Sequence, residues 1–163
     1  MKMKFIFIGL FLCFIIILTI ILNYKFGDSY KKIENIDRLR FSYTDGYAIN
    51  SYASYVLTCD LECTATVKPV GVSEEDFLSY NVSSDTIKKI EDLLNDNNVS
   101  NWNGFKKSDK YVLDGDSFSF SLHMSNGKSI EASGYMKWPK NYNEVKSRLD
   151  SIFLNLGDDV ISK

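Results

Sequence analysis

The pattern of hydrophobic and polar positions begins with an uncharged apolar run of eighteen residues, from Phe5 to Leu22. At about 1.5 Å per helical residue, such a run reaches about 27 Å, close to the hydrocarbon thickness of a bilayer. We therefore expect an uncleaved transmembrane helix. A cleaved signal peptide is one alternative, although the run is long for one and the only weak cleavage site is at residues 27–29. A core helix buried on all sides is the other.

Beyond residue 38 the pattern changes to strict alternation, which predicts three antiparallel strands. The residues expected to face the core are Leu39, Phe41 and Tyr43 in the first strand, Ile49, Ala53, Tyr55 and Leu57 in the second, and Ala65 and Val67 in the third. The third strand should span residues 64–70. Asp45-Gly46 predicts a turn between the first two strands. Residues 77–82 suit a further short strand.

A helical pattern follows, with Ser84 as its expected N-cap. Its apolar stripe consists of Ile87, Ile90, Leu93 and Leu94. The asparagine-rich stretch 95–104 should end this helix, and Trp102 within it should cover an end of the core.

A hairpin is predicted by alternation around Asn126-Gly127. A loop over residues 125–127 pairs Leu122 with Ile130, whereas a two-residue loop would place Leu122 opposite Glu131. The longer loop keeps apolar groups on one face, so we expect that register, with Gly127 in the left-handed conformation.

The last predicted element is a helix after Pro139, with Asn141 and Glu144 at capping-box spacing. Its apolar stripe consists of Val145, Leu149, Ile152, Phe153 and Leu156, and Gly157 should lie just past its end. The expected fold is α+β, with an antiparallel sheet in the order β-β-β-α-β-β-α and two helices on one face. We expect an anchor over residues 1–22, a stalk over 23–32, a single domain over 33–157 and a tail over 158–163.

Charge narrows the possible partners and the topology. All 21 acids and 17 of the 19 bases follow residue 22, so that part carries a net charge of 17 − 21 = −4. This balance argues against nucleic-acid binding. Lys2 and Lys4 favour a cytoplasmic N-terminus, whereas five bases between residues 25 and 40 oppose it. Because a single span after a short basic head is the usual export geometry, we expect a single-pass membrane protein with an extracytoplasmic domain.

Cys59 and Cys63 flank three residues, so a hairpin would bring them face to face. Outside the cytoplasm such a pair is expected to form a disulfide. Two separate free thiols in a cytoplasmic domain are the alternative. A zinc site is less well supported, since it needs two more ligands and His123 is the sole histidine.

Few other residues suggest chemistry. His123 lies on a serine-rich strand face, where a solvated side chain is the simpler interpretation and a general base the alternative. Asp109, Asp114 and Asp116 lack the spacing of a calcium loop and suit turns better. We expect no catalytic site, metal or cofactor, since no nucleophile elbow, zinc-protease helix or phosphate loop is present.

Aromatic and cationic side chains gather between residues 134 and 142. If the domain has a recognition surface, we expect it to include Trp138, Lys137 and Tyr142, beside the polar face that carries His123. The competing interpretation places Trp138 and Tyr142 in the core.

Several short motifs carry a resemblance to a known group of proteins. They are Asp114-Gly115-Asp116-Ser117-Phe118, Asn126-Gly127, Ser133-Gly134, Trp138-Pro139 and Asn141-Tyr142. Together they resemble the C-terminal half of small uncharacterised domains in bacterial exported and lipid-anchored proteins. The resemblance implies fold and location, and no activity. This chain departs from that group because it has no lipid-attachment cysteine.

These observations favour a membrane-anchored extracytoplasmic module that binds a protein or glycan partner without catalysis, and that contacts the membrane through residues 5–22. A membrane-associated immunity protein that neutralises a toxin is the first alternative. An enzyme is the second.

Overall fold

The computed structural model describes residues 32–44, 51–73 and 75–157. The chain divides into the units Met1–Lys31 and Lys32–Lys163, so the described residues all belong to the second unit. The expected anchor over residues 5–22, the stalk up to residue 31, the Asp45-Gly46 turn and the tail lie outside the described residues. None of the helices within the described ranges has both the length and the apolarity that crossing a membrane requires.

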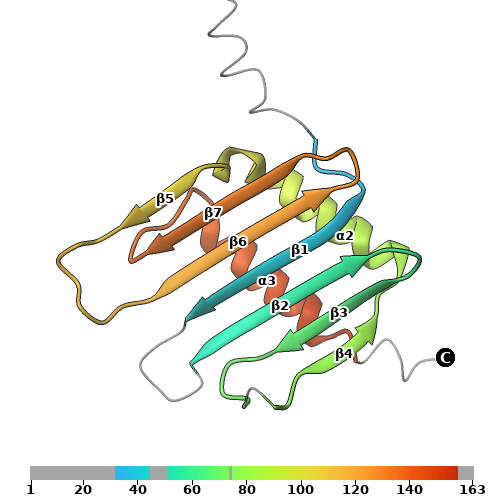
Figure 1. Cartoon of the computed structure of the whole chain (residues 1–163), viewed down its shortest axis with the longest axis horizontal. Helices are drawn as coiled ribbons and strands as arrows, with labels where there is room; N and C mark the ends of the chain where they lie inside the picture. Colours follow the sequence, from blue (N-terminus) through green and yellow to red (C-terminus); the bar gives the residue numbers. More distant parts are fainter. Residues whose placement is uncertain (1–31, 45–50, 74, 158–163) are drawn as a thin grey trace, which may run out of the picture. The chain divides into compact units, whose positions relative to one another are not determined.

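The elements follow one another along the chain in an α+β order. They are β1 (Ile36–Thr44), β2 (Tyr52–Cys59), β3 (Cys63–Lys68), β4 (Leu78–Asn81), α2 (Ser84–Asp96), the 3₁₀ helix η1 (Val99–Trp102), β5 (Phe105–Ser108), β6 (Ser117–Met124), β7 (Ser129–Tyr135) and α3 (Tyr142–Leu154). The strands form one seven-stranded sheet in the order β4-β3-β2-β1-β6-β7-β5. Helices α2 and α3 cover one face of it (Figure 1).

The predicted α+β class is confirmed. The predicted order β-β-β-α-β-β-α lacked two short strands, β4 and β5. The strand suggested at residues 77–82 forms as β4. Strand β5 was missed, because its sequence Phe-Lys-Lys-Ser has no alternation and it pairs in parallel with β7. It is tied to the sheet by non-local bonds: Gly104 N–H donates to the Glu131 carbonyl, and Glu131 N–H donates to Asn103 Oδ1.

The core lies between the helices and the sheet face that carries the predicted apolar residues. The alternating positions of β1, β2, β3, β6 and β7 are buried as expected, and Trp102 packs among them with 2% of its surface exposed. Its indole N–H donates to the Lys140 carbonyl at 3.0 Å. Tyr55 stacks on Phe153 of α3, with centroids 4.8 Å apart. Each fully buried side chain of this size contributes about 1.5–3 kcal/mol.

Both helix caps differ from the prediction. The N-cap of α2 is Ser83, one residue earlier than expected, and its hydroxyl accepts from Thr86 N–H. The predicted capping box of α3 is wrong: Asn141 has a left-handed φ of 63°, makes no side-chain cap, and donates instead to the Asn97 carbonyl. Gly157 does not directly follow α3, which ends at Leu154.

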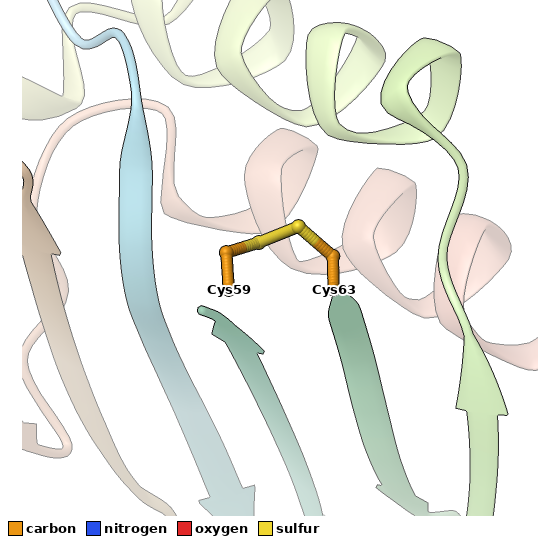
Figure 2. The surroundings of a disulfide bond; sticks show 2 residues. All are labelled: Cys59 and Cys63. Carbon is orange, nitrogen blue, oxygen red and sulfur yellow. A yellow bond between two sulfur atoms is a disulfide. The ribbon is translucent and has the colours of Figure 1, made fainter. Parts of the chain in front are cut away.

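Both predicted hairpin arrangements are confirmed. In the β6–β7 hairpin Leu122 pairs with Ile130, and Gly127 has a φ of 77°. In the β2–β3 hairpin Cys59 lies opposite Cys63 with Cα atoms 4.1 Å apart, and a disulfide joins them (Figure 2). Since the bridge closes a very short loop, the chain-entropy model limits its stabilisation to less than about 3 kcal/mol. Strand β3 ends at Lys68, not at residue 70 as expected.

Candidate functional site

The structure places the four predicted binding residues in two separate regions. Trp138 packs against Phe118 and Tyr142, which point toward the helices, because residues 136–141 connect β7 to α3 on the core side. His123 points the other way, since it alternates with buried Leu122. Trp138 and His123 therefore line different hollows of the domain.

A cleft lies around Trp138, with a volume of about 360 Å³, within the range of small-molecule sites. Four asparagine side chains line it, from the end of α2, from η1 and from the start of α3: Asn97, Asn98, Asn101 and Asn141. The rings of Trp102, Phe105 and Trp138 and the lysines Lys107 and Lys140 complete most of its wall. We call it the aromatic–amide cleft. The described residues that line it include no carboxylate.

The sequence left open whether Trp138 belongs to a contact surface or to the core, and its ring is partly exposed and partly packed. Its side chain is 37% exposed, so one part of the ring meets solvent. The other part stacks on Tyr142, with centroids 4.8 Å apart and ring planes 17° apart. Tyr142 itself is 5% exposed, so little of its own surface is open to a partner. It acts as the support that holds the indole in place.

Lys137 precedes Trp138 in the chain, but its side chain pairs with Asp109. Its ammonium pairs with Asp109 at 3.0 Å, and the side chain is half exposed. This Lys137 contact, together with the backbone N–H of Tyr111, holds the pKa of the Asp109 carboxyl below its usual range. The ion pair joins the loop after β5 to the loop after β7, so Lys137 positions the segment that carries Trp138.

Two asparagines of the cleft hold left-handed backbone conformations, with φ values of 53° at Asn98 and 63° at Asn141. Residues other than glycine seldom adopt this conformation, and such strain clusters at functional sites. Asparagine tolerates it better than most residues. The Asn141 side chain donates to the Asn97 carbonyl at 3.2 Å and so ties the two walls of the cleft together.

The four asparagines, Lys107 and Lys140 were not predicted as site residues. The density of asparagines over residues 95–104 is plain in the sequence, but it predicted only the end of a helix. What brings Asn97 and Asn141 together is the packing of α2 beside α3, which no local pattern encodes.

His123 belongs to the open face of the sheet, which the described helices do not cover (Figure 1). Its Nε2 lies 3.2 Å from Ser121 Oγ, and that hydroxyl donates to Glu131 at 2.7 Å. All three side chains belong to the solvated ladder expected for the serine face. No group of three or more potential metal ligands occurs within the described ranges, which include Asp109, Asp114 and Asp116.

Comparison with known proteins identified no matching family model, and no similar curated protein or solved structure was found.

Proposed function

We propose that this chain is a membrane-anchored extracytoplasmic binding protein, and that the aromatic–amide cleft holds a glycan. The observation that carries the proposal is the half-exposed Trp138 ring, held flat on buried Tyr142 beside a wall of asparagine amides. The Cys59–Cys63 disulfide supports an extracytoplasmic location, because such bridges persist in oxidising compartments. The apolar run over residues 5–22 supports the anchor.

The chemistry of the cleft suits a sugar. Each carboxamide both donates and accepts hydrogen bonds, as a sugar hydroxyl does, so asparagine can pair with hydroxyl groups in several orientations. A rigid indole supplies apolar contact area at low entropic cost. Lys107 and Lys140 add positive charge without a carboxylate among the described lining residues, which favours a glycan that carries acidic groups.

Binding without catalysis is supported by the same set of side chains. Lys107 and Lys140 are the titratable side chains among the described lining residues, and no histidine or carboxylate among those residues accompanies them as a general acid–base partner. The amides and rings of the cleft bind and orient a ligand, but they do not move protons. His123 lies on the other face of the sheet and does not supply that function.

The test is a titration of the full-length chain in detergent micelles with a panel of acidic and neutral oligosaccharides. Tryptophan fluorescence should change on binding, because Trp102 and Trp138 both line the cleft. Trp138→Ala should weaken binding about tenfold or more. Trp138→Phe should retain most of the affinity because the ring remains. Tyr111→Ala removes an aromatic ring that is 97% exposed in the loop after β5, and serves as the control.

A melting curve of each variant separates binding from folding. Truncating a fully buried aromatic residue costs about 3–5 kcal/mol, and partly exposed Trp138 should cost less, so Trp138→Ala remains folded. The proposal fails if no oligosaccharide binds, or if folded Trp138→Ala binds as tightly as the unaltered chain. Selective binding of neutral sugars would remove the role given to Lys107 and Lys140.

A further inference from the structure

A second hollow, independent of the aromatic–amide cleft, lies at the end of the sheet that carries Cys59. Figure 2 shows the disulfide that closes the β2–β3 hairpin at this end. Its volume is about 550 Å³, and it shares no described lining residue with the cleft around Trp138. The side chains that line it are Asp37, Arg38, Thr58, Cys59, Asp60 and His123. They come from β1, from β6 and from the β2–β3 hairpin.

An irregularity in β1 builds one wall of this hollow. Strand β1 pairs Ile36 with Met124 and Arg38 with His123, so the register shifts and Asp37 is an extra residue. In a regular strand, neighbouring side chains point to opposite faces. Here Asp37 and Arg38 are both exposed, between buried Ile36 and buried Leu39. Bulges of this kind re-aim side chains and occur next to binding sites.

The hollow is lined by charged groups of both signs, Arg38 together with Asp37 and Asp60. Arg38 lies directly opposite Thr58 on one neighbouring strand and His123 on the other. In the part of the chain that the structure describes, no ion pair joins Arg38, Asp37 or Asp60 to any partner. An arginine fork matches a carboxylate, and aspartates accept hydrogen bonds from an ammonium group.

We propose that this hollow binds the zwitterionic head group of a free α-amino acid. The Arg38 guanidinium takes the carboxylate, with Thr58 as a further hydrogen-bond donor. Asp37 and Asp60 take the ammonium group. A simple anion such as phosphate would meet two aspartates, and a simple amine would meet Arg38, so each is disfavoured by the like charge that it encounters.

The test uses the full-length chain in detergent micelles and a panel of free L-amino acids, with binding measured by calorimetry and by NMR shifts of the backbone amides near Arg38. The same amino acids with an acetylated amine or an amidated carboxylate, and inorganic phosphate, are the matched probes. We expect the free amino acid to bind and each blocked form to bind about tenfold or more weakly, because each loses one charge-assisted contact.

Variants connect the binding to the proposed residues. Arg38→Gln and Asp37→Asn should each weaken binding to a similar extent. Arg40→Gln alters an exposed arginine two positions along β1 that does not line the hollow, so its affinity should remain unchanged. Because all three positions are exposed, folding should persist, and melting curves check this. The proposal is overturned if no free amino acid binds, if phosphate or a blocked form binds equally well, or if folded Arg38→Gln retains full affinity.

Discussion

Gly134 in β7 occupies a position where an added methyl group has no room. A Cβ atom there would lie 2.0 Å from the Lys137 carbonyl oxygen and 2.5 Å from Cε1 of Phe118. The carbonyl belongs to the backbone of the segment that leads to Trp138, so it cannot turn aside as a flexible side chain would. Real Cβ contacts stay beyond 3.0 Å, so this oxygen must retreat by at least the 1.0 Å difference. We predict that Gly134→Ala destabilises the domain and displaces the Trp138 segment.

The magnitude follows from the rigidity of both neighbours. Overpacking a core costs typically 1–3 kcal/mol, and a backbone obstacle places this substitution at about 3 kcal/mol or more. For a domain of this size, 1 kcal/mol shifts Tm by about 3–5 °C, so Tm should fall by about 10 °C or more. Because Phe118 also contacts Trp138, the fluorescence of the half-exposed indole should change as well.

The assay is thermal and urea unfolding of the full-length chain, with Gly127→Ala as the matched control. Gly127 lies in the same hairpin with a φ of 77°, and its Cβ would meet no atom within 4 Å. Its substitution should cost only the strain of a left-handed alanine, about 1 kcal/mol. Equal stability of the two variants would refute the idea that close backbone approach requires glycine at position 134.

Three further predictions concern the titratable groups Tyr43 and Asp109. Tyr43→Phe removes a 2.8 Å hydrogen bond to Asp150 and should cost about 1–2 kcal/mol in urea unfolding; an unchanged midpoint would contradict this. Burial, and then the bond to Asp150, raises the pKa of Tyr43. The stability that Tyr43 contributes is therefore present below the ordinary tyrosine pKa near 10 and is lost as pH rises above that value. A spectrophotometric titration should show this tyrosine ionising only with unfolding. The pKa of Asp109 is lowered, so the pH dependence of stability is reversed: its contribution is present above the ordinary carboxyl range and is lost as pH falls. Carbon NMR should show that Lys137→Met raises the pKa of Asp109. An unchanged pKa would exclude the ion pair as the main cause of the lowering.

Much of the fold was predictable because it depends on local periodicity. Alternation placed Leu39, Phe41 and Tyr43 on the buried side of β1, and burial confirms all three. The apolar pattern fixed the β6–β7 register with its loop over residues 125–127, since a slip by one residue would have turned apolar residues toward water. The spacing of Cys59 and Cys63 predicted their pairing across a hairpin.

Both candidate sites depend on contacts between distant parts of the chain, and no local sequence pattern encodes such contacts. The cleft forms where the asparagine-rich end of α2 meets the start of α3, and the left-handed turn at Asn141 is held by Asn97, 44 positions away. The bulge at Asp37 is defined by the shift in register between β1 and β6. Strand β5 forms by parallel pairing with β7. Hydrophobic periodicity predicts whether a side chain faces water or the core. Which other side chains lie next to it is determined by non-local hydrogen bonds and packing.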